Sequence, residues 1–342
     1  MIRAWALLAA ATSAIAGSPA LAAPTSCDRA CLGGIVDSVM SSMTAHRPEA
    51  IPLAPTYRAT ENSHPAALGM MTAWRTVTKA GRPALVALDP KDGSAYFASA
   101  VMEGTSPSVL WGRLKVVDRK VSEIEIYLNR SRGDHGFSFS TEQIPANYRV
   151  LATPPAGRAR SSRADLLKLA KASFDASDPL KVEVAQDCQF TEVGSKVIDP
   201  GLDDGPASPP PGLKPGEPFD KYKPLGCMFP PFRPTDKDAR IIAIDDDLGI
   251  VVTAAVIPGT VYPYPFEGRM LSAFIPSDMK EAGTVQDAWI KRHVKRGGAP
   301  IVDPEPATGE VFQVFQMYDG RMHASQINVY LSGPGARSVW AR

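Results

Sequence analysis

Two glutamates occupy matching sequence contexts and are the first candidates for acid–base chemistry. Glu61 ends a segment that begins at Arg58 and reads Arg-Ala-Thr-Glu, and Glu192 ends a segment that begins at Gln189 and reads Gln-Phe-Thr-Glu. A carboxyl group that an apolar lining removes from water has a raised pKa and can serve as a general acid or base. A helix cap or a turn contact explains a motif present in both segments equally well.

Three of the five histidines are further candidates for proton transfer, because imidazole titrates near neutral pH. His64 lies three residues beyond Glu61, His135 lies in a segment flanked by glycines, and His323 begins the last β-rich run. In a chain of this size most histidines are expected at the surface or in structural hydrogen bonds. Trp74, Arg75 and Tyr127 can line a pocket or bind a carboxylate, but core packing with one surface arginine is the favoured reading.

Several classes of function are disfavoured by the sequence. It contains no Gly-x-Ser-x-Gly elbow, no phosphate-binding glycine loop before a helix and no His-Glu-x-x-His, so serine hydrolase, nucleotide-dependent and zincin chemistry are not indicated. The 37 basic and 36 acidic residues form no concentrated basic patch, and nucleic acid is not an expected partner. We therefore expect no cofactor and no metal.

Residues 1–22 are predicted to be a secretory signal peptide. Arg3 supplies the positive start, the run from Ala4 to Ala16 is apolar, and Ala20 and Ala22 are the small residues of a cleavage site. A membrane anchor is the alternative, but the apolar run is too short for a span of roughly 20 residues. We expect cleavage near Ala22 and a periplasmic or secreted protein without a membrane span.

The four cysteines fit an oxidising compartment, where an even number usually indicates disulfides. Three pairings are possible. Cys27 and Cys31 are four residues apart near a predicted helix start, whereas Cys188 and Cys227 bracket a proline-rich stretch, so the favoured pairing is Cys27 with Cys31 and Cys188 with Cys227. A metal site is less favoured because no Cys-x-x-Cys or His-x-x-x-His spacing accompanies them.

The same pattern of segments occurs twice along the chain. The run from Leu85 to Asp89, with a glycine four residues on, returns from Ile241 to Asp245, and each run is followed by a second β-rich run, as in a hairpin. The run from Ile124 to Leu128 is similar to the run from Ile327 to Leu331. Together with the Thr-Glu segments, these matches in the same order predict a tandem duplication.

The offset between the copies grows along the chain. It is 131 residues from Glu61 to Glu192, 156 from Asp89 to Asp245 and 203 from Tyr127 to Tyr330. These steps place insertions at about 195–226 and 258–308, where the prolines concentrate. Proline-rich stretches form neither helices nor central strands, so we expect loops or covers there.

An amphipathic helix is predicted to open each copy. Apolar residues recur at three- and four-residue steps between Leu32 and Met43 and between Leu166 and Phe174. Helices followed by antiparallel strands indicate an α+β fold in which each helix covers a curved sheet. The predicted domains are residues 24–150 and 160–342.

The order of these elements resembles the SnoaL-like, nuclear transport factor 2-like superfamily of cone-shaped α+β barrels. More closely, the chain resembles a secreted fungal and bacterial family of unknown function with two such cones in tandem. The resemblance rests on Cys27-Asp28-Arg29, the run from Tyr57 to Asn62, the segment from Gly133 to Phe137, Ser162-Arg163 and the run from Ala243 to Gly249. In the second copy Val193 replaces Asn62.

The resemblance implies a pocket inside each cone for an apolar or aromatic small molecule. It would place Glu61, Asn62 and Glu192 beside the pocket mouth and turn His323 toward the cavity. The predicted function is an exported pocket protein that acts as an isomerase, lyase or hydratase by transferring a proton through Glu61 or His323. The alternative is a non-catalytic ligand-binding or structural protein of the cell envelope.

Overall fold

The computed structural model describes residues 26–130, 139–174, 182–196, 226–227, 238–266, 269–295 and 303–341. The predicted signal peptide, the segment around His135 and most of the first predicted insertion lie outside these ranges. Within the ranges, no helix has the length and apolar character that a membrane span requires.

A capped amphipathic helix opens each half of the chain, as predicted. α1 (Arg29–Thr44) follows Asp28, whose side chain accepts a hydrogen bond of 2.9 Å from the amide of Cys31. α5 (Arg163–Ala172) begins with a capping box between Ser162 and Asp165. The buried stripes include the predicted apolar residues Leu32, Ile35, Val36, Val39 and Met43 in α1, and Leu166, Leu169 and Ala170 in α5.

Seven strands of the first half form one mixed sheet in the order β2-β1-β7-β6-β5-β3, with β4 paired to β5. The strands are β1 (Leu53–Glu61), β2 (His64–Pro65), β3 (Val77–Ala80), β4 (Leu85–Asp89), β5 (Ser94–Glu103), β6 (Ser106–Val117) and β7 (Lys120–Arg130). Three short helices lie among them: η1 (Pro48–Ala50), η2 (Leu68–Met70) and α2 (Thr72–Thr76).

The second half repeats this arrangement in the order β10-β11-β13-β14-β8-β9, with β12 paired to β11. Its strands are β8 (Glu183–Glu192), β9 (Ser195–Lys196), β10 (Arg240–Asp245), β11 (Ile250–Phe266), β12 (Arg269–Pro276), β13 (Glu305–Tyr318) and β14 (Arg321–Ser332). α3 (Ile144–Asn147) and α4 (Arg149–Ala152) precede α5, and α6 (Lys280–Lys295) follows β12. In both sheets the first strand runs parallel to the last.

The register of the two sheets corrects the alignment of the copies in their last strand. Glu61 is paired with Ile126 in the first sheet, and Glu192 is paired with Ile327 in the second. The offset in this strand is therefore 201 residues, the distance from Ile126 to Ile327, and Tyr127 corresponds to Asn328. A shift of two residues keeps every side chain on the same face of a strand, so the hydrophobic pattern alone did not reveal it.

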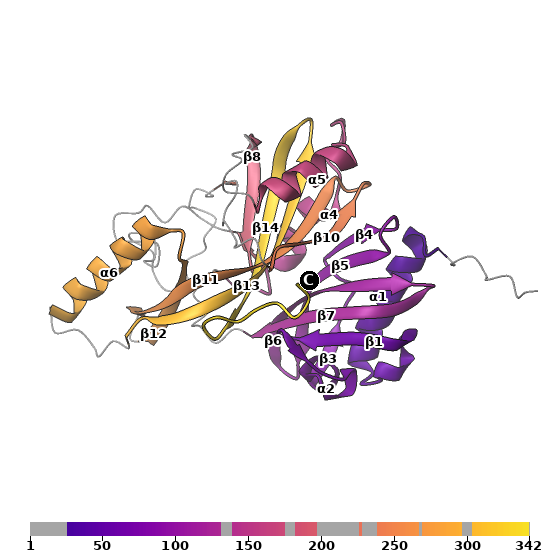
Figure 1. Cartoon of the computed structure of the whole chain (residues 1–342), viewed down its shortest axis with the longest axis horizontal. Helices are drawn as coiled ribbons and strands as arrows, with labels where there is room; N and C mark the ends of the chain where they lie inside the picture. The colour runs from indigo at the N-terminus through magenta and orange to yellow at the C-terminus, as the bar shows by residue number, and fades with distance from the viewer. Residues whose placement is uncertain are drawn as a thin grey trace, which may run out of the picture.

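The two sheets pack face to face between the two helices. In β5, Phe97 contacts the α1 side, whereas Tyr96 and Ala98 belong to the cluster shared with the second sheet. In β11, Val251 packs with α5, and Ile250 belongs to the shared cluster. The molecule is thus layered as helix, sheet, sheet and helix (Figure 1).

This architecture contradicts the predicted pair of cone-shaped SnoaL-like α+β barrels. The protein is mostly β, and its two mixed seven-stranded sheets do not close into barrels. Each sheet buries one face under its helix and the other against its neighbour, so neither face is free to enclose a cavity. Under α1, side chains such as Leu32, Met43 and Phe97 are fully buried and fill the space in which a cone would hold a ligand.

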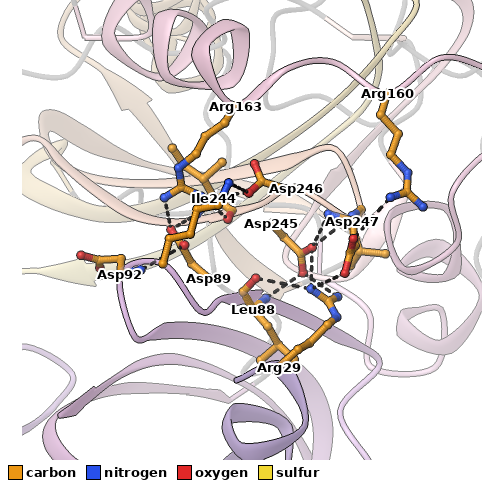
Figure 2. A network of polar contacts seen from close by, with 12 residues as sticks. Arg29, Leu88, Asp89, Asp92, Arg160, Arg163, Ile244, Asp245, Asp246 and Asp247 are labelled. Atoms are coloured by element: carbon orange, nitrogen blue, oxygen red, sulfur yellow. Dashed lines mark hydrogen bonds and ion pairs between the residues drawn. The ribbon is translucent and has the colours of Figure 1, made fainter. Parts of the chain in front are cut away.

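Two reciprocal ion pairs join the halves (Figure 2). Arg29, the first residue of α1, binds both carboxylate oxygens of Asp245 in the second half at 2.8 and 2.9 Å. Arg163, the first residue of α5, binds Asp89 in the first half at 2.7 Å. The same two aspartates accept amide hydrogen bonds across the junction, from Leu88 to Asp245 and from Ile244 to Asp89. Equivalent residues therefore make the same contact in both directions.

The second proline-rich region is not a loop, contrary to the prediction. β11 continues to Phe266 and pairs with β12, and α6 follows, forming an arm that extends away from the junction of the sheets (Figure 1). The pairing of β11 with β13 ends at Val261, and among the described residues no other strand takes the place of β13 beyond it, so prolines there can occupy that edge without removing ladder hydrogen bonds.

Both disulfides have the predicted pairing, Cys27 with Cys31 and Cys188 with Cys227. Two disulfides in one chain are compatible with an oxidising compartment. The second disulfide anchors β8 at Cys188 to residues far along the chain, with a sequence separation of 39.

The segment after β14 returns to the first sheet. Trp340 is 7% exposed, and its indole N–H donates to the hydroxyl of Thr60 at 2.9 Å. The guanidinium groups of Arg58 and Arg113 lie 4.5 and 4.4 Å from the centre of the Trp340 ring, within the range of a cation–π contact. The end of the second half therefore completes the packing of the first.

Candidate functional site

Glu61 lies at the end of β1 and holds the start of α2. Its carboxylate oxygens accept backbone hydrogen bonds from Thr72 at 2.6 Å and from Ala73 at 2.7 Å. α2 has no side-chain cap from its own N-cap residue, Met71. Glu61 therefore supplies that cap. This is the structural role that the sequence left open as the alternative to catalysis.

Replacing Glu61 with alanine is expected to lower the free energy of unfolding by about 1 kcal/mol, because two N–H groups at a helix start lose their acceptor. Urea unfolding followed by circular dichroism measures the change. Glu61→Gln, which keeps one carbonyl oxygen, should recover part of the loss. An alanine variant as stable as the wild type would contradict the capping role.

Asn62 forms the turn after β1. Its side-chain oxygen accepts a hydrogen bond of 2.9 Å from the amide of Leu128, and its φ of 50° lies in the left-handed region that asparagine tolerates. The equivalent Val193 has a φ of 42°, an unfavourable angle for a β-branched residue. Asn62 and Val193 thus form the same kind of turn. In the first half the Asn62 side chain is also hydrogen-bonded to β7 at Leu128.

The other residues predicted to line a pocket are dispersed. Trp74 is buried under α1, where its ring N–H donates to Ser42 at 2.9 Å. Glu192 ends β8 in register with Ile327, as Glu61 ends β1. Tyr127 lies between the sheets, stacked on Trp111 with ring centres 5.4 Å apart. The structure therefore does not bring Glu61, Trp74 and Tyr127 together around a common cavity.

Tyr127 belongs to a buried polar cluster between the sheets. Its hydroxyl oxygen lies 2.9 Å from a carboxylate oxygen of Glu310 and 3.1 Å from one of Glu125, so its one proton is shared between them. Glu125 is fully buried and also binds Arg113 at 2.6 Å and both terminal nitrogens of Arg240 at 2.8 and 2.9 Å. Burial would raise the pKa of Glu125, but the hydrogen bonds and charges of the two arginines hold it below its usual range.

Burial raises the pKa of Glu310, the second carboxyl group of this cluster, despite hydrogen bonds from Ser332 and Tyr127. Every carboxylate oxygen of Glu125 and Glu310 already has a partner within the protein. We therefore assign the cluster to the cohesion of the two sheets.

A wide bulge in the second sheet forms a pocket beside His323. Met322 is paired with Val184 and Ala324 with Gln189, so four residues of β8 stand opposite the single residue His323 of β14. Such bulges disrupt the ladder locally and redirect side chains. The resulting pocket has a volume of about 640 Å³ and is lined by Ala185, Gln186 and Asp187 of β8, Asp319, Arg321 and His323 near the start of β14, and Arg158.

Arg158 reaches the pocket from the segment that connects the halves. The next residue, Ala159, donates its amide to the Asp319 carboxylate at 2.7 Å and accepts the amide of Asp319 at 2.9 Å. Arg160 forms a β-bridge with Tyr318. These contacts fix the connecting segment against the β13–β14 turn and hold Arg158 at the pocket.

His323 is the histidine of the pocket wall, with a side chain 7% exposed. Burial lowers its pKa, and the charge of Arg158 lowers it further, because the Arg158 nitrogen Nη1 lies 2.5 Å from Nδ1 and 2.8 Å from Nε2 of the imidazole. Asp187 acts in the opposite direction from 4.0 Å. The lowered pKa favours the neutral form of the ring, which can accept a proton.

The first half has the same bulge but not the same chemistry. Leu53 pairs with Val121 and Arg58 with Glu123, so four residues of β1 stand opposite Ser122. Ser122 corresponds to His323 by the offset of 201, and its hydroxyl donates to the carbonyl of Lys115 at 3.2 Å. Of the two equivalent positions, the one in the second half alone is a histidine.

Of the residues that form this pocket, the sequence indicated His323 and missed Arg158 and Asp187. Arg158 lies in a connection without hydrophobic periodicity, and Asp187 lies in a bulge that a regular alternation of side chains does not predict. Among the residues described by the structure, no group of three or more histidines, cysteines, aspartates or glutamates is placed to hold a metal ion.

No protein-family model and no curated protein matches the sequence. Among solved structures, the chain is similar to a de novo designed protein with a curved β-sheet, at 14% sequence identity. That similarity covers 30% of this chain and 88% of the designed protein, with a TM-score of 0.26. At this TM-score it carries no argument about fold or function.

Proposed function

We propose that the protein is an exported small-molecule-binding protein whose ligand site is the pocket at His323. Export is supported by residues 1–22, which read as a signal peptide, together with the two disulfides. The observation that carries the binding role is the bulge of four residues against one, which leaves a recess of about 640 Å³ where charged groups from three segments converge. This volume lies within the roughly 300–1,000 Å³ typical of ligand pockets.

A thermal-shift screen with lipophilic and aromatic metabolites tests this proposal. A bound ligand stabilises the folded state, by about 2.7 kcal/mol at a concentration of 100 times its Kd. We expect a compound that raises the Tm of the wild type to lose its effect in His323→Ala. Ser122→Ala, at the equivalent bulge of the first half, should keep the full shift.

Two outcomes of this screen would contradict the proposal. One is a shift that persists unchanged in His323→Ala, which would place the ligand elsewhere. The other is a broad screen in which no compound stabilises the wild type.

The lowered pKa of His323 favours a catalytic role for the same pocket. A neutral imidazole can remove a proton from a bound molecule, and Asp187, 4.0 Å away, would offset part of the opposing charge of Arg158 in the imidazolium that results. Isomerisation, elimination and hydration all require such a transfer. Recovery of a bound compound chemically unchanged after prolonged incubation would identify a binding protein, whereas its conversion would identify an enzyme.

A further inference from the structure

Arg158 differs from the other partly buried arginines in the use of its donors. Arg29, Arg113, Arg130, Arg163 and Arg240 each hydrogen-bond a carboxylate at 2.9 Å or less. Arg158 is separated from Asp187 by 3.7 Å, which is an ion pair but too long for a hydrogen bond. Within the described part of the chain, its close polar contact is the ring of His323.

The two carboxylates near the Arg158 guanidinium either have another hydrogen-bond partner or are exposed to solvent. Asp319 accepts the amide of Ala159, so its charge fixes the connecting segment. Asp187 has a side chain 74% exposed, which leaves it hydrated. Arg321, the other pocket arginine, hydrogen-bonds Glu183 at 3.0 Å. Among the described residues, Arg158 is therefore the pocket arginine for which no hydrogen bond to a carboxylate is present.

A guanidinium with unused donors in a recess is suited to a carboxylate, which it can bind through two parallel hydrogen bonds. The connecting segment already holds Arg158 in place through Ala159 and Arg160. Little conformational freedom would be lost on binding, and such preorganisation favours affinity.

We propose that the pocket takes a small carboxylate-bearing molecule whose carboxylate binds the guanidinium of Arg158 beside His323. This inference rests on the proposed ligand site and adds the chemical class of the ligand. The rest of the ligand would contact Ala185 and Gln186 in the bulge, which line the same pocket.

Binding of this kind would also change the protonation of His323. The groups facing the imidazole are Arg158 from the connecting segment, Asp187 from β8, Tyr318 and Asp319 at the β13–β14 turn, and Arg321 on its own strand. A ligand carboxylate would neutralise the charge of Arg158 and add a negative charge next to the ring. The imidazole should therefore take up a proton when the carboxylate binds near neutral pH.

Calorimetric titration with benzoate, phenylacetate and succinate, each compared with its amide, tests the inference. We expect at least one carboxylate to bind at least ten times more tightly than its amide. Arg158→Gln should weaken that binding at least tenfold and Arg158→Lys less, whereas Arg82→Gln, at an exposed arginine of the first half, should change it less than threefold. Titration in two buffers of different ionisation enthalpy should show proton uptake that is absent in His323→Ala.

Equal affinity for acids and amides, or binding unaffected by Arg158→Gln in a variant with wild-type circular dichroism, would overturn the inference. Failure of all three acids to bind at millimolar concentration would overturn it as well. Neutral compounds that bind in a manner dependent on His323 would leave the proposed site intact while excluding carboxylates. The two proposals can thus fail separately.

Discussion

Asp245→Ala is expected to lower the free energy of unfolding by about 3–5 kcal/mol, the range for breaking a buried ion pair by removing one partner. The Asp245 side chain is fully buried and binds Arg29 through both oxygens. It also accepts amide hydrogen bonds from Leu88 at 2.7 Å, Asp247 at 3.0 Å and Leu248 at 3.1 Å. The variant would leave these donors without their acceptor, and each buried unsatisfied group costs about 1–3 kcal/mol.

Asp246→Ala is the matched control for this prediction. Asp246 follows Asp245 in the same turn and pairs with Lys91 at 2.8 Å and with Arg163 at 3.4 Å, but its side chain is 37% exposed. Exposed ion pairs contribute about 0–1 kcal/mol, so this variant should remain close to the wild type. Chemical denaturation of both proteins measures the difference. An equal loss of stability in the two variants would contradict the larger contribution assigned to the ion pair between Arg29 and Asp245.

The second large effect is expected at Glu125, between the sheets. Glu125→Ala would leave Arg113 and Arg240 buried without the carboxylate that binds both, at an expected cost of about 3–5 kcal/mol. Glu123→Ala is the control, because Glu123 lies two residues away on the same strand and binds Arg113 at 2.7 Å with a side chain 22% exposed. We expect that control to lose under about 1 kcal/mol.

The stability contributed by Glu125 should depend on pH in a defined direction. Its pKa lies below the ordinary value of 4.5 in the folded protein, so the folded state binds fewer protons than the unfolded state in that range. The difference in stability between the wild type and Glu125→Ala should be fully present above about pH 4.5 and should shrink as the pH falls further. A difference that grew in acid would contradict this assignment.

The sequence predicted local structure well and the assembly of the sheets poorly. Helix caps at Asp28 and Ser162 and the apolar stripes that follow are local signals, and both helices formed where expected. The alternation of apolar and polar residues along a strand, by contrast, shows which side chains are buried but not which element covers them. The outer and inner faces of β5 are both apolar, and only the structure shows that the face bearing Tyr96 meets a second sheet.

The same argument applies to the candidate site. Glu61 and Asn62 were identifiable as a repeated motif, but in the first half Glu61 caps a helix and Asn62 forms a turn, and that turn recurs at Val193 in the second half. Function is better sought where the halves differ at an equivalent position. His323 and Ser122 are such a pair, and they became comparable only after the strand register had set the offset at 201.

The reciprocal contacts of Arg29 and Arg163 make the junction an isologous interface within a single chain. Each half carries both partners of the pairing, an arginine at its first helix residue and an aspartate at its hairpin. Either half expressed alone would therefore be a candidate homodimer, in which Arg29 of one copy meets Asp89 of the other. Two halves expressed separately and then mixed would assemble through the same contacts. In the folded chain each sheet is covered by its helix on one face and by the other sheet on the opposite face.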